Sequence, residues 1–234
     1  MKKLRVDIWS DVVCPWCAIG KRRFEAALAR FAHKDEVEVV WRAFELDPSA
    51  PAVQPGDNAT RLARKYGRTR EQAVAMMQQV AETAKREGLY FDLVHARSGN
   101  TFDAHRVLHL AAERGVQDAV KERFLRGYMT EQQPIGDREV LVRLAAEAGL
   151  DPEEVRVTLA GDSFAAEVRE EEDVAHRLGI HGVPFFVMGG AIGVSGAQPA
   201  EVLLGALEQA WGRAAAEGEA PEAEGAVCGP DGCA

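Results

Sequence analysis

The chain has 234 residues, of which 47% are hydrophobic and 28% charged, and its formal net charge is −9 at pH 7. This composition is ordinary for a globular protein, and the length suits one large domain or one domain that carries an insertion. The acidic balance argues against binding to nucleic acid or to anionic membrane surfaces. No stretch approaches the ~18 uncharged apolar residues of a membrane span.

The first residues bear on the compartment of the protein. Lys2, Lys3 and Arg5 resemble the start of a secretory signal, but Asp7 and Asp11 interrupt the apolar stretch that a signal needs. We therefore expect a cytoplasmic protein. In that compartment, paired cysteines serve in catalysis or metal binding more often than as structural disulfides.

A strand–helix–strand unit is predicted at the N-terminus. Apolar residues alternate at positions 4, 6 and 8 and predict a strand that ends near Asp11. Apolar residues then recur at helical spacing over 20–31, and alternation returns over 37–44. Such a unit pairs its two strands in parallel through a right-handed crossover.

The rest of the chain predicts a helical block followed by a hairpin. Three prolines over 47–56 indicate an irregular link, and residues 58–178 have helical spacing that glycines divide into six or seven helices. A strand pair over 184–194 turns at Gly189-Gly190. A last helix is expected over 199–215.

This order predicts an α/β protein with a thioredoxin fold interrupted by a large all-helical insertion. We expect a split thioredoxin-fold domain at 1–55 and 180–213, a helical insertion domain at 56–179, and an acidic flexible tail at 214–234. The tail contains five acids and no base, and it ends in a second cysteine pair, Cys228 and Cys233.

The motif Cys14-Pro15-Trp16-Cys17 lies where the first strand gives way to the first helix. A helix N-terminus offers unpaired N–H groups and the positive end of the dipole, and both favour a thiolate over a thiol. Pro15 suits the first helical position. The pattern predicts that Cys14 is the exposed nucleophile and that Cys17, one turn further in, resolves a mixed disulfide on Cys14.

At this point the chain resembles the DsbA-like thiol–disulfide oxidoreductases, specifically their FrnE-type cytoplasmic branch. The resemblance spreads over residues 4–211. The matching segments are Ser10-Asp11-Val12-Val13-Cys14-Pro15-Trp16-Cys17, Gly20-Lys21-Arg22-Arg23, Asn100-Thr101 with Ala104-His105-Arg106, Gly182-Val183-Pro184-Phe185-Phe186, and Ser195-Gly196-Ala197-Gln198-Pro199.

The resemblance implies a cis peptide bond before Pro184, packed beside the dithiol. A proline that opens a strand donates no hydrogen bond to the sheet, and the Val183 backbone there could pair with an extended substrate. Trp16, together with Pro15, would shape the substrate side of the motif. The resemblance also implies that Asn100, Thr101 and His105 line a pocket near the dithiol.

The implied activity is exchange with protein or peptide disulfides and dithiols. No prosthetic group and no metal are expected, and glutathione or a thioredoxin-like donor are candidate redox partners. A buried carboxylate at Asp7 or Asp11 could take the proton of Cys17. The tail pair, Cys228 and Cys233, is a candidate second dithiol that exchanges with the first.

Several alternatives remain open at the level of the sequence. Free cysteines also pack as small core residues. The two cysteine pairs together could hold zinc in a zinc-responsive or redox-sensing protein. Relatives of the same fold, the kappa-class glutathione transferases and the chromene-carboxylate isomerases, use the first thiol position to activate glutathione, often without a second cysteine. The presence of Cys17 argues against that reading.

Overall fold

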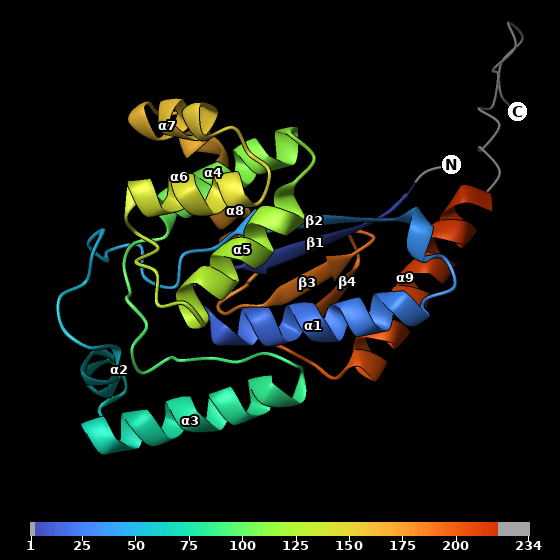
Figure 1. Cartoon of the computed structure of the whole chain (residues 1–234). Helices are drawn as coiled ribbons and strands as arrows, with labels where there is room; N and C mark the ends of the chain where they lie inside the picture. The colour runs from blue at the N-terminus through green and yellow to red at the C-terminus, as the bar shows by residue number, and fades with distance from the viewer. Residues whose placement is uncertain (1–2, 220–234) are drawn as a thin grey trace, which may run out of the picture.

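A computed structural model of the chain describes residues 3–219 (Figure 1). The elements in chain order are β1 (Leu4–Ser10), α1 (Pro15–Arg30), the short 3-10 helix η1 (Lys34–Glu36), β2 (Val37–Ala43), α2 (Asn58–Tyr66), α3 (Arg70–Arg86), α4 (Phe102–Glu113), α5 (Gln117–Met129), α6 (Arg138–Glu147), α7 (Pro152–Ala160), α8 (Ala165–Arg177), β3 (Phe185–Met188), β4 (Ile192–Ser195) and α9 (Ala200–Glu219).

The strands form one mixed sheet in the order β2-β1-β3-β4. β1 and β2 pair in parallel over their whole length, which is the pairing expected of two strands joined by the crossover helix α1. β3 runs antiparallel to β1, with Trp9 opposite Phe185, and β4 returns antiparallel to β3. The C-terminal end of β1 and the N-terminal end of β3 therefore lie side by side at the same end of the sheet.

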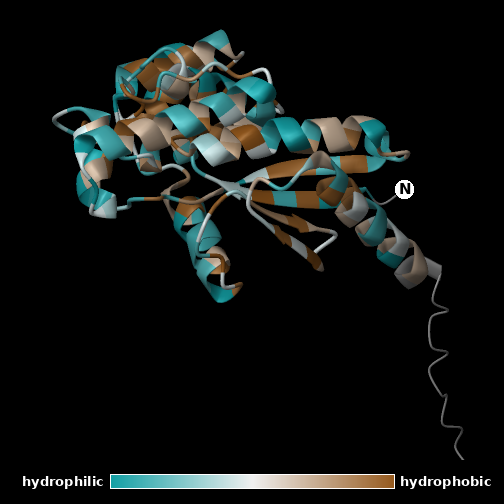
Figure 2. Ribbon diagram, turned by 90° about the horizontal axis from the view of Figure 1, so that it is seen from below, coloured by the Kyte–Doolittle hydropathy of each residue, from teal (hydrophilic) through white to brown (hydrophobic). Residues whose placement is uncertain are grey.

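The alternation along β1 decides which helices cover each face of the sheet. Leu4, Val6 and Ile8 pack in one hydrophobic cluster with residues of α1 and α9. Trp9 points to the other face, where it packs with Ala175 of α8, because successive side chains of a strand project to opposite sides. In Figure 1, α1 and α9 lie together below the sheet and the helices α4–α8 lie above it. Figure 2 shows the hydrophobic residues concentrated on the strands.

The helices between β2 and β3 have a core of their own. Its centre consists of large side chains with no exposure, among them Val107 of α4, Phe124 of α5 and Leu144 of α6. Val12 and Ala18, from the segment around the cysteine motif, belong to the same cluster. The motif is therefore packed against the inserted helices as well as against the sheet. The helices α2 and α3 extend away from α4–α8 in Figure 1, but Ala59 and Met77 belong to the same cluster.

The predicted fold class, a thioredoxin fold interrupted by an all-helical insertion, is confirmed. Seven α-helices occupy residues 58–177, within the range of six or seven expected. The hairpin also forms, with β3 and β4 joined through Gly189 and Gly190, both of which have positive φ. One boundary differs, since α9 continues to Glu219 and not to position 215. The alanine run at 214–216 explains the extension, because alanine is the best helix former.

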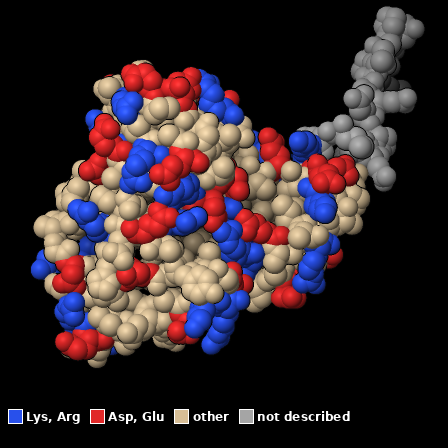
Figure 3. Space-filling model, in the orientation of Figure 1, with Lys and Arg blue, Asp and Glu red and all other residues tan. Residues whose placement is uncertain are grey.

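The surface carries charges of both signs. In the view of Figure 3, basic and acidic side chains are interspersed, and many pair along or between helices, such as Arg114 with Glu154 and Arg123 with Glu147. None of the helices within residues 3–219 combines the length and the apolar composition that crossing a membrane requires.

Candidate active site

Cys14 and Cys17 lie at the first turn of α1. Cys14 is the N-cap residue with an extended backbone, and Pro15 occupies the first helical position. The N–H groups of Cys17 and Ala18 both donate to the carbonyl of Cys14, at 3.0 and 3.4 Å. Both sulfurs are free thiols. The prediction that Cys14 is exposed is wrong, because Cys14 is 4% exposed and Cys17 1%, and Cys14 is covered by Val183. The N-terminal end of α1, with its positive dipole end, thus lies at Cys14.

The resolving position has a distinct electrostatic environment. Burial is the largest cause that raises the pKa of the Cys17 thiol well above its usual value, and the hydrogen bond and charge of Cys14 raise it further. The charge of Lys121 opposes this rise. Cys17 therefore holds its proton tightly until a partner group helps to remove it.

Val183 and Pro184 lie against the first cysteine. The peptide bond between them is cis, as expected. The Cys14 thiol donates a hydrogen bond to the carbonyl oxygen of Val183 at 3.5 Å, which confirms the expected packing beside the dithiol. On the opposite side, Pro184 packs on Gly20 of α1, where an added Cβ would lie 2.8 Å from Pro184 Cγ.

Asp11 is a buried carboxylate behind the motif. Its Oδ2 accepts the N–H of Leu46 at 2.8 Å, and its Oδ1 lies 3.6 Å from Nε2 of His105. Burial favours the neutral acid, but the hydrogen bond and charge of His105 and the Leu46 N–H outweigh it, so the pKa of Asp11 is lowered. Asp11 is therefore an ionised carboxylate with partners of its own.

The three residues predicted to line a pocket take different positions. Thr101 lines a cleft beside Cys14. His105 lies behind the motif, buried against Asp11. Asn100 donates to Glu45 Oε2 at 3.0 Å and accepts the N–H of Phe102, so it orders the link between β2 and α4.

A cleft of about 320 Å³ opens beside the dithiol. Cys14, Pro15, Trp16 and Val183 form one side of it. The opposite wall comes from α2 and α3. It contains the apolar or aromatic residues Leu62, Tyr66, Met76, Met77 and Val80 together with the polar or charged residues Asn58, Arg61 and Lys65. Trp16 and Met76 are each 42% exposed, whereas Met77 is buried. Met77 thus belongs both to the helical core and to the floor of the cleft wall, whereas Met76 is exposed to the cleft.

Lys121 of α5 is a residue near the dithiol that the motifs did not single out. It has no exposed surface, and its Nζ donates to the carbonyl of Ser10 at 3.2 Å. The sequence did carry a signal. Lys121 stands three and four positions before Phe124 and Leu125, which places a lysine on the apolar face of its helix.

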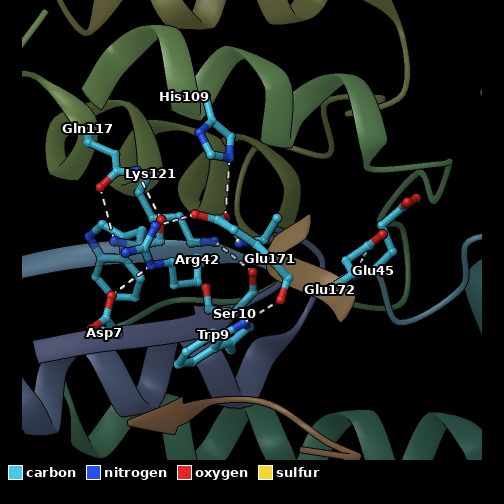
Figure 4. A network of polar contacts seen from close by, with 12 residues as sticks. Asp7, Trp9, Ser10, Arg42, Glu45, His109, Gln117, Lys121, Glu171 and Glu172 are labelled. Carbon is cyan, nitrogen blue, oxygen red and sulfur yellow. Dashed lines mark hydrogen bonds and ion pairs between the residues drawn. The ribbon is translucent and has the colours of Figure 1, made fainter. Parts of the chain in front are cut away.

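Figure 4 shows a polar network between β2, α4 and α8 in which Lys121 takes part. Arg42 of β2 pairs with Asp7 and with Glu171, and Nε2 of His109 lies 3.2 Å from Glu171 Oε2. Asp7 therefore has arginine partners, Arg5 and Arg42. Within residues 3–219, no three His, Cys, Asp or Glu side chains gather as a metal site would need.

The second cysteine pair, Cys228 and Cys233, lies outside the described residues. The last described helix, α9, leaves the body at the end of α1 that is remote from Cys14 (Figure 1). Near this end, the Trp211 ring lies 6.0 Å from the ring of Phe31, the residue that caps α1.

Comparison with known proteins agrees with this geometry. The family model of the DSBA-like thioredoxin domain matches residues 5–208. The chain therefore belongs to the DsbA-like family, which supports a general disulfide oxidoreductase activity. The narrower FrnE-type placement stays a prediction.

Among solved structures, a probable DsbA oxidoreductase from Streptomyces coelicolor is 50% identical, with a TM-score of 0.85, and the match covers 99% of this chain and 98% of that one. The YwbO protein of Bacillus subtilis, which is uncharacterised, is 28% identical over 81% of this chain and 88% of its own length.

Two more distant structures share the fold alone. The cytosolic disulfide reductase DsbM from Pseudomonas aeruginosa is 19% identical, with a TM-score of 0.58 over 92% of this chain and 98% of that one, and it has also been solved with glutathione. A 2-hydroxychromene-2-carboxylate isomerase is 18% identical, with a TM-score of 0.60 over 92% and 97%.

Proposed function

We propose that this protein exchanges disulfides with protein or peptide substrates, with Cys14 as the nucleophile and Cys17 as the resolving thiol. The observation that carries the proposal is the position of Cys14. Cys14 is the N-cap residue of α1, its sulfur contacts the Val183 carbonyl and it lines the cleft, while Cys17 lies one turn deeper. A first sulfur that borders a cleft and a second sulfur one turn behind it are what sequential exchange needs.

The chemistry proceeds in two exchanges. The Cys14 thiolate attacks a substrate disulfide, forms a mixed disulfide and releases the first substrate sulfur as a thiolate. Deprotonated Cys17 then attacks the Cys14 sulfur, forms the Cys14–Cys17 disulfide and releases the second substrate sulfur. Two electrons pass from the dithiol to the substrate, and the reverse sequence oxidises a substrate dithiol. The redox potential relative to the compartment decides which direction prevails.

The cleft supports a peptide as the substrate. Its wall on α2 and α3 contains apolar side chains, and the exposed parts of Trp16 and Met76 face the same space. The Val183 carbonyl accepts a hydrogen bond from the Cys14 thiol. Once that sulfur enters a mixed disulfide it has no proton to donate, and the carbonyl is free to accept another hydrogen bond. An extended peptide could then donate an N–H to Val183 as an added strand would.

The proposal requires no prosthetic group and no metal, since sulfur alone carries the electrons. We propose glutathione or a thioredoxin-like protein as the partner that resets the dithiol, and the cytoplasm as the compartment. The structure of DsbM with glutathione supports the first suggestion, and the description of DsbM as cytosolic supports the second, both by fold analogy.

We propose that the tail pair exchanges between molecules and not within one. α1 is ~24 Å long at ~1.5 Å per residue, and Trp211 packs at its far end from Cys14. The nine residues from 219 to 228 span at most ~30 Å when fully extended. An exchange within one molecule would need nearly full extension of that segment, so the rate should rise in proportion to protein concentration.

A glutathione-dependent transferase or isomerase is the second candidate, because the chain shares its fold with a chromene-carboxylate isomerase. The two activities differ in their need for Cys17, since transfer from a glutathione held at the first position does not require a resolving thiol. Transferase activity that survives Cys17→Ser, with no disulfide reduction by the parent, would favour this candidate.

The deciding experiment compares Cys14→Ser and Cys17→Ser, each in a full chain that also carries Cys228→Ser and Cys233→Ser, in reduction of insulin and in trapping of a peptide mixed disulfide. We expect both variants to lose turnover. Cys17→Ser should accumulate one stable mixed disulfide per chain by mass spectrometry, and Cys14→Ser should accumulate none. Equal trapping by the two variants would contradict the assignment of Cys14 as the nucleophile.

A further inference from the structure

The helix α2 and the turn after it are basic, although the chain as a whole has a formal net charge of −9. Residues 58–70 contain no acid and five bases, which are Arg61, Arg64, Lys65, Arg68 and Arg70. Two of these, Arg61 and Lys65, line the cleft beside Cys14. They are four positions apart and therefore lie on the same face of the helix. Part of the positive charge of α2 thus faces the space that a substrate would enter.

Arg61 is held in place by a neutral side chain. Its Nε and Nη2 donate to Oδ1 of Asn58, at 3.2 and 2.8 Å. Asn58 is 5% exposed, and its amide nitrogen donates to the Leu93 carbonyl at 2.6 Å. Asp57, the acid that precedes α2, pairs with Arg70, and within residues 3–219 no carboxylate lies within ion-pair distance of Arg61. The guanidinium is therefore oriented, but its charge is not compensated.

Two hydroxyl groups lie beside this arginine. The Ser98 Oγ is 3.5 Å from Asn58 Oδ1 and 2.8 Å from the hydroxyl of Tyr128, and both residues line the cleft. Burial raises the pKa of Tyr128, and the hydrogen bond of Ser98 and the charge of Arg61 limit that rise. The phenol is therefore protonated at neutral pH. Since the two hydroxyls share one hydrogen bond, one hydroxyl hydrogen is left for a further acceptor.

The acids of the cleft do not neutralise this cationic end. Only Asp11 and Asp47 contribute carboxylates to the lining. Asp11 accepts the Leu46 N–H and faces His105, and Asp47 accepts the Ser49 hydroxyl at 2.8 Å. Both acids thus have donors of their own, and the donors on α2 are available to an anion.

We propose that Arg61, together with Lys65, forms a carboxylate-binding subsite in the cleft, and that the preferred substrates are peptide disulfides with Asp or Glu next to the reacting cysteine. Asn58 occupies Nε and one hydrogen of Nη2, so both hydrogens of Nη1 and the second of Nη2 remain. That is enough for the two parallel N–H···O bonds of a guanidinium–carboxylate pair. This inference rests on the proposed function and adds the chemical class of the peptide.

The rest of the cleft favours a peptide over glutathione as the source of the carboxylate. Trp16, Tyr66 and Met76 line the same space and are 42%, 54% and 42% exposed. Glutathione carries carboxylates but no large apolar side chain that would cover these three residues. A peptide with an acidic residue and apolar residues around its cysteine matches both parts of the cleft.

The test isolates the attack by Cys14 in the full chain. The parent carries Cys17→Ser, Cys228→Ser and Cys233→Ser, so the reaction stops at the mixed disulfide. The substrates are acetylated and amidated peptides that differ only in the residues flanking one cysteine, which are Glu, Gln or Lys. Each cysteine is activated as a 2-thiopyridyl disulfide. Cys14 forms a bond to the peptide sulfur, and the uncharged thiopyridone is released and measured by its absorbance.

The variants change the charge of α2 inside or outside the cleft. The test variant carries Arg61→Gln and Lys65→Gln. The matched control carries Arg64→Gln and Arg68→Gln, which remove two exposed charges outside the cleft lining. Each rate is divided by the rate of the same peptide with mercaptoethanol, because flanking charges also change the reactivity of the disulfide itself.

We expect the parent to react at least ~10-fold faster with the Glu peptide than with the Gln peptide at low salt, as hydrogen bonds to a charged group allow. The preference should shrink at 1 M salt, where the screening length is ~3 Å. The test variant should lose the preference and keep its rate with the Gln peptide, and the control should retain the preference. Arg61→Glu with Lys65→Glu should instead prefer the Lys peptide, a gain that damage to the fold does not produce.

Four results would count against these statements. Equal rates of the parent with the Glu and Gln peptides overturn the subsite and leave the proposed function intact. Equal loss of all three rates in the test variant also overturns it. A test variant that is slower only with thiopyridyl-activated glutathione overturns the assignment to peptides. If the parent reacts with none of the peptides, Cys14 is not the nucleophile and the proposed function itself fails.

Discussion

The Cys14 thiol and the Val183 carbonyl oxygen are 3.5 Å apart, although the two residues are separated by 169 positions in the chain. The sheet brings them together, since β1 ends beside the start of β3, with Trp9 opposite Phe185. The contact is kept in register by Gly20, because Pro184 occupies the space where a side chain at position 20 would lie.

Replacing Gly20 with alanine should therefore impair the site. The new Cβ would lie 2.8 Å from Pro184 Cγ, a contact that forces Pro184 and Val183 away from Cys14. We expect the rate of mixed-disulfide formation to fall on the order of tenfold, as small displacements of reacting groups do. Stopped-flow kinetics with a peptide disulfide measures this rate.

Gly205→Ala is the matched control for this change. Gly205 is also helical, but an added Cβ there meets no atom within 4 Å. It should stabilise the protein by up to ~1 kcal/mol through helix propensity alone, with unchanged kinetics. Equal rates in Gly20→Ala and Gly205→Ala would show that the Gly20–Pro184 contact does not hold Val183 in place.

A charge among the apolar residues of the cleft wall should weaken peptide binding. Met76 lines this wall and is 42% exposed, so Met76→Asp removes apolar surface that a peptide would cover. We expect the KM to rise on the order of tenfold for peptides whose disulfide is flanked by apolar residues. Such a rise corresponds to the loss of ~1.5 kcal/mol of binding free energy from apolar burial. The KM for hydroxyethyl disulfide should not change.

Val157→Asp controls for a general effect of surface charge, since Val157 is 63% exposed on α7, away from the cleft. A similar rise in KM for both substrates in Met76→Asp, or a rise in Val157→Asp, would count against the cleft as the peptide site.

The ionised form of Asp11 should stabilise the fold in a pH-dependent way. Asp11→Ala leaves the Leu46 N–H without its acceptor and removes the carboxylate 3.6 Å from the buried His105, which should cost ~3 kcal/mol in the free energy of unfolding at pH 7. Asp137→Ala, which removes the N-cap of α6, should cost only ~1 kcal/mol. Urea unfolding of both variants measures these differences.

The pH dependence follows from the lowered pKa of Asp11. A carboxyl with a lowered folded pKa adds stability above its unfolded pKa of ~3.9, and that stability disappears as the pH falls through the folded value. The difference between wild type and Asp11→Ala should therefore shrink below about pH 4. A constant difference from pH 7 to pH 2 would mean that the charge of Asp11 contributes nothing.

Lys121 should give a pH dependence of the same sign as Asp11 but in a higher pH range, best measured with the Cys14–Cys17 disulfide formed so that neither thiol titrates. Its folded pKa is about 8, below its usual 10.5, so between these values the unfolded chain binds the proton that the folded chain has lost. Stability relative to Lys121→Met should rise with pH across that window, by ~3 kcal/mol in total.

Lys21→Met provides the contrast. Burial lowers the pKa of Lys21, but Asp118, Glu25 and Glu122 outweigh it and the pKa is raised. Its contribution is therefore complete below pH 10.5 and lost only above it. Thermal unfolding from pH 7 to 10.5 separates the two lysines, and a flat difference for Lys121→Met would disagree with a neutral amine in the fold.

Much of the fold was predictable because its signals are local. The parallel pairing of β1 with β2 follows from the strand–helix–strand order, and the β3–β4 turn follows from Gly189-Gly190. The position of the cysteine motif at the start of α1 follows from Pro15. Spacing of a few residues is enough for each of these features.

The surroundings of the dithiol depend instead on long-range packing. The sequence shows a lysine on the apolar face of α5, but not that this face lies behind Cys17. It shows two acids near the end of β1, but not that Arg42 binds Asp7 while Leu46 and His105 hold Asp11. Those assignments depend on segments that meet only when the inserted helices close over the sheet.

The position of Cys14 and Cys17 is thus predictable from local spacing, because Pro15 starts the helix and makes Cys14 its N-cap residue. The charge that limits the rise in the pKa of Cys17 comes from Lys121 on α5, and the wall of the cleft beside Cys14 comes from α2 and α3. Both features come from helices that are distant from the motif in the sequence, so only the tertiary structure determines which side chains surround the two cysteines.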